Sequence, residues 1–260
     1  MYTRFQIYLY NEDKMRILII NGWTREGDQN HIDAGCIVQS TVFGNLIKLV
    51  DKGINIKFYN SYGEGKIELN NYDAFVWTGS GNNIYETNCH NKNQIDTCKK
   101  VLKLNKPIWG SCWGMQVIAT ALGGKVERGR SPEFGISRDI QIVNNELRDS
   151  IYKNKAVIFD APAHHSDVIT KVPETFQVIA QNEKCIQSMY SKEKKIFCTQ
   201  YHPELPYDYL GKMMQFWIMN YKDHMTREEF ESLLKELDEK EKAESKTRIL
   251  EFRNWLTCID

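Results

Sequence analysis

Short apolar runs alternate with segments of helical periodicity along the first half of the chain. Residues 16–22 read Arg-Ile-Leu-Ile-Ile-Asn-Gly, which is typical of a buried parallel strand. Residues 34–52 then place apolar side chains at helical spacing, and further strands are expected at 54–59, 73–78 and 106–110. This alternation predicts an α/β fold with a mostly parallel central sheet and helices on both faces.

The second half of the chain is expected to hold shorter strands and then helices. The strands are expected at 156–159, 176–180 and 196–201, and the helices at 115–122, 207–221 and 227–256. Residues 23–35 match neither pattern. We interpret them as a solvated loop, and a contribution to a substrate pocket is the alternative. The predicted organisation is an N-terminal extension (1–14), a main domain (15–224) and a C-terminal helical extension packed on that domain (225–260).

Composition excludes several classes of protein. The 34 basic and 34 acidic side chains cancel, so the net charge gives no reason to expect binding to nucleic acid or to a membrane. The seven cysteines include no CxxC pair, so neither a zinc site nor a disulfide framework is expected, and no motif indicates a cofactor. The chain has no apolar run of transmembrane length and no convincing secretory signal, which predicts a cytoplasmic protein with reduced thiols.

One cysteine lies in a sequence suited to a nucleophile. Residues Gly110-Ser-Cys-Trp-Gly114 follow an apolar strand and precede a helical pattern. Flanking glycines permit a turn tight enough to hold Cys112 above the sheet, and the helix N-terminus favours an anion there. The backbone N–H of Trp113 would face a developing oxyanion. A buried structural cysteine is the alternative, and this motif alone does not decide between them.

A candidate base follows a second strand. The run Phe197-Cys-Thr-Gln-Tyr201 leads into His202-Pro203-Glu204, and Pro203 ends the strand. A carboxylate two residues after a histidine can hold one imidazole nitrogen and leave the other for a thiol. A surface His-Pro-Glu turn is the alternative. The pairing of this motif with the cysteine turn favours a catalytic site, because both motifs lie at the carboxyl ends of strands, where active sites of parallel sheets are found.

Taken together, these motifs resemble the class I glutamine amidotransferase family, in particular the glutaminase domain of GMP synthase. Gly110-Ser-Cys-Trp-Gly-Met-Gln116 resembles the family's G-I-C-Y-G-M-Q, and Cys198-Thr-Gln-Tyr-His-Pro-Glu204 resembles its Q-x-H-P-E segment. Residues 133–135, 165–167 and 78–81 resemble its E-F-G, H-G-D and S-G-G-P segments. The resemblance covers about residues 16–222 and implies a flavodoxin-like three-layer sandwich.

The resemblance also implies a set of site residues. Cys112 would be the nucleophile, His202 the general acid and base, and Glu204 its orienter. Backbone N–H groups of Trp113 and of the Gly79–Gly81 turn would form the oxyanion hole. The substrate-binding residues would be Gly79, Gln116, Phe134, Gly135, His165, Ser166 and Asp167. Ser80 and Gly81 replace the family's Gly-Pro pair, and Ser111 and Trp113 also depart from its pattern.

The implied activity is hydrolysis of the γ-amide of glutamine or of a γ-glutamyl compound through a γ-glutamyl thioester. Three interpretations of it stay open. The chain could be a glutaminase subunit that delivers ammonia to a separate synthetase, because it contains no S-G-G-x-D-S phosphate loop of its own. It could be a stand-alone γ-glutamyl hydrolase or peptidase. It could also be a non-catalytic binding or sensing relative, which the retention of His202 and Glu204 disfavours.

Overall fold

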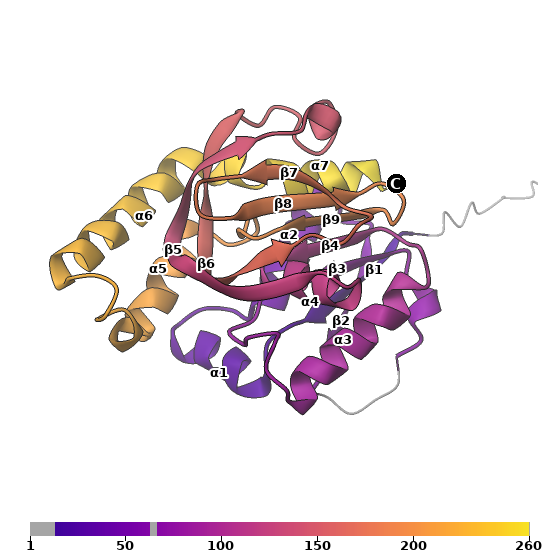
Figure 1. The fold of residues 1–260 in the computed structure, drawn as a ribbon, viewed down its shortest axis with the longest axis horizontal. Helices are drawn as coiled ribbons and strands as arrows, with labels where there is room; N and C mark the ends of the chain where they lie inside the picture. Colours follow the sequence, from indigo (N-terminus) through magenta and orange to yellow (C-terminus); the bar gives the residue numbers. More distant parts are fainter. Residues whose placement is uncertain (1–13, 63–66, 260) are drawn as a thin grey trace, which may run out of the picture.

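The computed structural model describes residues 14–62 and 67–259. The predicted N-terminal extension therefore lies outside the described residues, except for Lys14. A single sheet runs through the molecule with strand order β2-β1-β3-β4-β9-β8-β7-β5-β6. Figure 1 shows this sheet with helices packed around it. The predicted α/β fold is confirmed.

The first half of the sheet is parallel. It consists of β1 (Arg16–Asn21), β2 (Asn55–Asn60), β3 (Ala74–Trp77), β4 (Ile108–Ser111) and β9 (Ile196–Thr199). Side chains of β1 alternate between two cores, with Ile17 and Ile19 on one face and Leu18 and Ile20 on the other. Helices cover both faces, so nearly every residue of these strands except β2 is apolar and buried.

The second half of the sheet is antiparallel. It consists of β8 (Ile186–Ser191), β7 (Gln177–Gln181), β5 (Lys125–Ile142) and β6 (Ile158–Lys171). The expectation of short strands here was wrong for β5 and β6, which contain 18 and 14 residues. Irregular register between Arg128 and Glu133, and again between Ser137 and Ile140, interrupts the alternation of side chains. Long strands with bulges therefore look like several short ones in the sequence.

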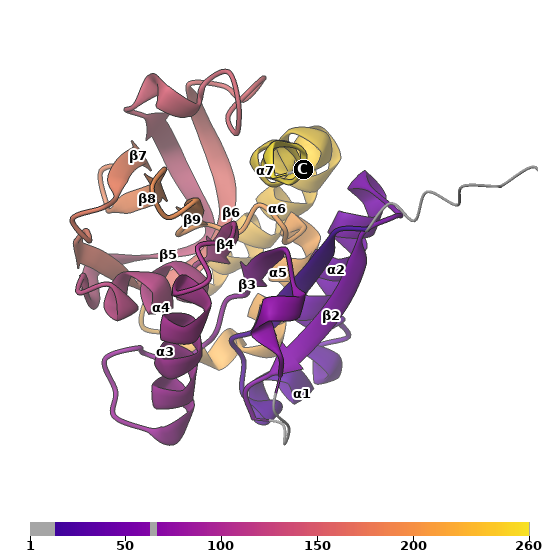
Figure 2. The ribbon, with the colours of Figure 1, turned by 90° about the vertical axis from the view of Figure 1, so that its right-hand side faces the viewer.

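The helices form two layers (Figure 2). On one face, α2 (Gln39–Val50) and α7 (Leu250–Cys258) pack with Trp109 in the larger core. On the other face, α3 (Cys89–Leu102) and α4 (Trp113–Ala121) pack with Trp77. A further cluster joins α5 (Tyr207–Phe216) and α6 (Arg227–Arg248) to β5. Three short 3-10 turns lie at Leu69–Asn71, Asn145–Leu147 and Ile218–Asn220.

The segment 23–35 contains a helix, α1 (Arg25–Asp33), so its interpretation as a loop was wrong. Thr24 caps this helix by accepting a hydrogen bond from the backbone N–H of Gly27. The inward face of α1 is polar, because Asp28 accepts hydrogen bonds from the side chains of Asn21 and Tyr62. A polar buried face gives no apolar periodicity, and the sequence pattern therefore missed the helix.

The C-terminal residues expected as one helix over 227–256 form two helices that meet at Ile249. Thr226 and Glu229 form a capping box at the start of α6. Phe252 and Trp255 of α7 contact Trp109 in the core. The separation of residues 225–260 from the main domain stays a prediction. Across the described ranges, no helix combines the length and apolar character needed to cross a membrane.

Candidate active site

The nucleophile turn joins β4 to α4. Cys112 has φ 50° and ψ −101°, a conformation that residues other than glycine rarely adopt. A Cβ on Gly114 would lie 2.7 Å from the carbonyl oxygen of Trp77, and one on Gly110 would lie 2.8 Å from the Ile118 side chain. Both glycines are therefore required by close packing. The backbone N–H of Cys112 donates to the carbonyl of Thr199 at 2.7 Å, which ties this turn to β9.

The base turn follows β9. The backbone N–H of His202 donates to the carbonyl of Pro162 at 2.7 Å. The ring Nδ1 of His202 lies 2.7 Å from Oε1 of Glu204. Both side chains are buried, and Glu204 is fully excluded from solvent. Because Glu204 holds Nδ1, the other ring nitrogen is left for the sulfur of Cys112.

The electrostatics of the site favour a charged imidazole. Burial disfavours the charged form of His202, but the negative charge of Glu204 and a hydrogen bond with Cys112 outweigh burial and raise the pKa of His202 to about 10. A protonated His202 at neutral pH is the partner that a thiolate needs. The neighbouring His164 stays neutral, because burial and the charges of His202 and His165 lower its pKa to about 4. Cys112, His202 and Glu204, predicted from two distant motifs, thus lie together.

Two further side chains hold Glu204, and no sequence pattern indicated these contacts. Gln39, at the start of α2, donates through Nε2 to Oε1 of Glu204 at 2.7 Å. The indole N–H of Trp23 donates to Oε1 of Gln39 at 2.7 Å and fixes the orientation of that amide. Ser111 donates to Oε2 of Glu204 at 3.0 Å. Gln39 lies in a part of the chain without a motif and Ser111 lies in the nucleophile motif, so only the fold reveals their contacts with Glu204.

Arg248 of α6 supports the same turn from the C-terminal segment. Its Nη1 donates to the carbonyl oxygen of Pro203 at 2.6 Å. Arg248 is buried, and burial lowers the pKa of its guanidinium. This hydrogen bond holds the peptide group that joins Pro203 to Glu204. The sequence analysis predicted a helix over this part of the chain, but no motif there indicated this contact.

The candidate oxyanion donors lie beside the cysteine. Trp113 is the first residue of α4, where a backbone N–H has no acceptor within the helix. Ser80 and Gly81 line both hollows that adjoin Cys112 and His202. A Cβ on Gly79 would lie 2.8 Å from Cε1 of His202, so the turn can approach the imidazole only with glycine there.

A small cavity of about 120 Å³ contains the nucleophile. Four predicted substrate residues line it with Cys112, namely Gln116, His165, Ser166 and Asp167. Nε2 of Gln116 donates a hydrogen bond to the backbone carbonyl of Asp167, and the hydroxyl of Tyr85 donates one to the side-chain carboxylate of Asp167. Nδ1 of His165 is buried and has no hydrogen-bond partner among the described residues. We call this hollow the cysteine cavity.

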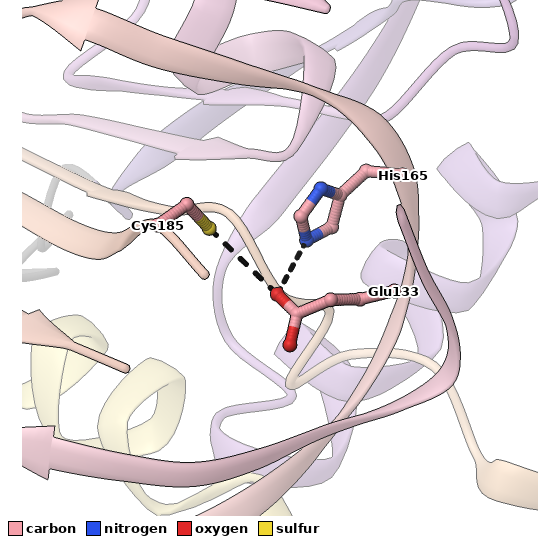
Figure 3. Close-up of side chains that lie close together, drawn as sticks. All are labelled: Glu133, His165 and Cys185. Atoms are coloured by element: carbon pink, nitrogen blue, oxygen red, sulfur yellow. Dashed lines mark hydrogen bonds and ion pairs between the residues drawn. The ribbon is translucent and has the colours of Figure 1, made fainter. Parts of the chain in front are cut away.

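Behind the cysteine cavity, Glu133, His165 and Cys185 approach one another closely enough to suggest a metal site (Figure 3). Nε2 of His165 lies 3.1 Å from Glu133, and the side chains of Asn182 and Gln187 also donate to this carboxylate. Burial opposes ionisation of Glu133, but these bonds, led by that of His165, lower its pKa to about 2. Burial raises the pKa of the Cys185 thiol, which disfavours the thiolate that metals bind. The cluster is suited to orienting His165, and the absence of a metal stays a prediction.

Two predicted substrate residues lie farther back. The ring of Phe134 packs on those of His164 and Tyr221, and its side chain lines a separate hollow with Arg138 and Leu233. Gly135 has φ +83°, and a Cβ there would meet Leu233 of α6. Neither residue lines the cysteine cavity within the described structure. Phe134 thus contacts His164, which lines the cysteine cavity.

A second hollow of about 370 Å³, the aromatic chamber, lies on the His202 side. It shares Ser80, Gly81, Asn82 and His164 with the cysteine cavity. Its other walls come from α1, α5 and their flanking residues, including Trp23, Glu26, His31, Tyr209, Met213 and Trp217. The segment 23–35 therefore shapes a pocket, which was the less favoured of its two interpretations.

Comparisons with known proteins agree with this arrangement. The family Glutamine amidotransferase class-I matches residues 32–218. A GMP synthase [glutamine-hydrolyzing] from Finegoldia magna is 35% identical over 142 residues, which are 54% of this chain but only 26% of that protein. A gamma-glutamyl-L-1-hydroxyisopropylamide hydrolase from a Pseudomonas species is 31% identical over 204 residues, covering 74% of this chain and 68% of that protein.

A solved structure shares the fold across nearly the whole chain. The glutamine amidotransferase from Thermotoga maritima superposes with a TM-score of 0.69 at 20% identity, covering 94% of this chain and 97% of that one. The predicted flavodoxin-like sandwich is confirmed by this likeness. The family match spans more than half of the chain and includes both active-site turns. The chain belongs to the class I glutamine amidotransferase family of enzymes.

Proposed function

We propose that the chain hydrolyses the γ-amide of glutamine or of a γ-glutamyl compound with Cys112 as nucleophile. The observation that carries this proposal is the geometry of Cys112 and His202. A cysteine held at positive φ lies at the head of a helix, within hydrogen-bonding reach of a buried, charged imidazole that Glu204 orients. This is the arrangement of an activated thiol nucleophile with its acid and base.

The first half of the reaction forms a thioester. The sulfur of Cys112 bonds to the γ-carbonyl carbon, and the oxyanion accepts hydrogen bonds from the backbone of Trp113 and of the Ser80–Gly81 turn. His202 then donates its ring proton to the departing nitrogen as the carbon–nitrogen bond breaks. Ammonia or an amine leaves, and a γ-glutamyl thioester remains on Cys112.

The second half releases glutamate. His202, now neutral, accepts a proton from water as the water oxygen bonds to the thioester carbon. The carbon–sulfur bond breaks and restores the thiolate and the imidazolium. The glutamyl part fits the cysteine cavity, where the Asp167 carboxylate suits the α-ammonium and Nδ1 of His165 is free to bond a ligand.

Two candidate functions differ in what happens to the nitrogen that leaves the γ-amide. A glutaminase subunit passes ammonia to a synthetase partner, and the likeness to glutamine-hydrolysing GMP synthases supports this. A stand-alone γ-glutamyl amide hydrolase releases an amine, and the aromatic chamber beside His202 favours this second candidate. We place the chain in the cytoplasm, since all seven cysteines are unpaired, as in a reducing compartment.

The test is glutamate release by the purified protein from glutamine and from γ-glutamyl amides, with Cys112→Ala as the control. Cysteine-dependent release is expected. A Cys112→Ala protein as active as the original chain would overturn the assignment. A protein that releases no glutamate alone, yet is labelled at Cys112 by an electrophilic glutamine analogue, would identify the subunit that depends on a synthetase.

A further inference from the structure

The two hollows divide a γ-glutamyl substrate at its scissile bond, and this inference rests on the proposed function. Cys112 lines the cysteine cavity, whereas His202 lines the aromatic chamber. The general acid must touch the leaving nitrogen to protonate it. The leaving group therefore departs on the side of the aromatic chamber, and the glutamyl part remains on the other.

The chamber is far larger than ammonia requires. Its volume is about 370 Å³, compared with about 120 Å³ for the cysteine cavity. One water, a molecule close to ammonia in size, takes roughly 30 Å³ in the liquid. The chamber thus falls within the ordinary range for small-molecule sites, which starts at about 300 Å³.

One side of the chamber is aromatic and apolar. The ring centroids of Trp23 and Trp217 are 6.2 Å apart and their planes meet at 25°, so the two indoles are stacked on this side. His31 packs edge-on against both indoles. Met213 and Leu210 of α5 complete the apolar side. Flat aromatic walls favour a planar apolar group, because ring stacking adds to the gain from burial.

The charge of the chamber excludes an acid group. Its lining contains the carboxylate of Glu26 and no lysine or arginine among the described residues. The positive charge of His202 is already balanced by Glu204. His31 Nδ1 bonds the carbonyl of Gly27, and burial lowers the pKa of this ring, so it adds no cation. A carboxylate or phosphate on the leaving amine would find no lysine or arginine to pair with among the described lining residues.

We propose that the aromatic chamber binds the amine half of the substrate, and that the preferred substrates are γ-glutamyl amides of aromatic amines without an acid group. Trp217 and Trp23 contact the ring, and Glu26 disfavours anions at the mouth. The chamber therefore selects against γ-glutamyl peptides, whose leaving groups have a carboxylate at this position.

The test compares three substrates whose leaving groups are ammonia, an aromatic amine and an aromatic amine with a carboxylate. These are glutamine, γ-glutamylphenethylamide and γ-glutamylphenylalanine, of which the last two differ by one carboxylate. We expect kcat/KM for the phenethylamide to exceed both others by about tenfold or more, the scale of discrimination that one apolar group gives. Equal values for all three, or a preference for γ-glutamylphenylalanine, would overturn the inference.

Two variants locate the preference. Trp217→Ala should lower kcat/KM for the phenethylamide about tenfold more than it lowers kcat/KM for glutamine. Phe216→Ala is the matched control, because Phe216 is the neighbouring exposed aromatic and does not line the chamber. Glu26→Lys, a change at an exposed position, should raise the relative rate on γ-glutamylphenylalanine. This second variant keeps the test valid if Trp217→Ala fails to fold.

Binding gives a readout that does not depend on turnover. Titration of Cys112→Ala with each compound should show the same order of affinity, weakened selectively by Trp217→Ala. Cleavage of glutamine alone, with no binding of the phenethylamide, would refute the chamber assignment and leave the proposed hydrolysis intact. Failure of all three compounds to release glutamate would instead refute the proposed function, and this inference with it.

Discussion

The nucleophile turn and the base turn are built in different ways. The turn at Cys112 is determined mainly by five consecutive residues, because its glycines permit the close approach and its positive φ is local; one backbone bond to Thr199 ties it to β9. The turn at His202 depends on distant parts of the chain. Gln39 of α2, Ser111 of β4 and Arg248 of α6 each bond to it. One catalytic group is thus positioned by local backbone geometry, and the other by tertiary contacts.

This difference predicts which property each substitution should change. Changes at the nucleophile turn should disturb the backbone and therefore both folding and rate. Changes around the base turn should alter the pH dependence of the reaction first, because they act on the proton of His202. Four substitutions test the contrast, in order of decreasing expected effect.

Glu204→Gln should have the largest effect. Loss of the carboxylate should lower kcat by roughly 10²–10⁴-fold, as for other orienters and acid–base groups. The charge of Glu204 raises the pKa of His202, so its removal should move the alkaline fall of kcat/KM to lower pH. The measurement is glutamate release across neutral and alkaline pH. An unmoved alkaline limb would contradict the role of Glu204.

The same charge pair contributes to stability with a defined sign. The folded pKa of His202, about 10, lies above its unfolded value of about 6.5. The contribution of protonated His202 to the free energy of unfolding is therefore complete below about pH 6.5 and is lost as pH rises through about 10. Glu204→Gln should flatten this fall in the free energy of unfolding. Glu251→Gln is the control, since it removes another buried carboxylate, paired with Lys155 and not with His202.

Gly114→Ala tests the nucleophile turn. The added methyl group would lie 2.7 Å from the carbonyl oxygen of Trp77, so the backbone must shift. We expect a loss of about 1–3 kcal/mol in the free energy of unfolding. A displaced Trp113 N–H should lower kcat by about 10²-fold, with an unchanged pH profile. Gly211→Ala in α5 is the control, because its nearest neighbour would be 3.7 Å away.

The contrast between the turns also explains what the sequence could predict. Cys112 was found because glycine spacing and a strand-to-helix junction are short-range signals. His202 and Glu204 were found because they are adjacent in sequence to a strand end. Gln39 and Arg248 were missed, since their contacts cross 165 and 45 positions of the chain.

The elements of the fold also divide into those with a local sequence signal and those that depend on distant contacts. The parallel strands β1, β3, β4 and β9 were predicted because burial on both faces makes them mostly apolar. The lengths of β5 and β6 were missed, because their bulges break the alternation that marks a long strand. Helix α1 was missed because its buried face is polar, and the chamber that it lines was missed with it. Packing between distant segments determines these features.

Gln39→Leu should have a smaller effect on the base turn. Glu204 would lose one of its donors but keep Ser111, so we expect kcat to fall by about tenfold. The alkaline limb should move only slightly. Gln94→Leu is a matched control, because Gln94 is also buried and accepts from an indole, that of Trp77. A loss of stability without a change in kcat for both variants would show that Gln39 serves folding alone.

Arg248→Met should have the smallest effect and tests the C-terminal segment. The substitution removes the bond to the Pro203 carbonyl but keeps the length of the side chain. His202 would still be held by the Pro162 carbonyl, so we expect kcat to fall by less than about tenfold. A positioning role predicts that Arg248→Lys restores part of this loss and that the pH profile shifts with it.

Arg148→Met provides the comparison, because Arg148 also donates to a backbone carbonyl, that of Lys155, outside both turns. Each variant should lose about 1–3 kcal/mol of stability through an unpaired carbonyl. Only Arg248→Met should change the rate well below its unfolding temperature. If both variants keep the original kcat, α6 contributes to folding but not to the base turn. The base turn would then depend on α2, β4 and β6, and the contrast with the nucleophile turn would be correspondingly weaker.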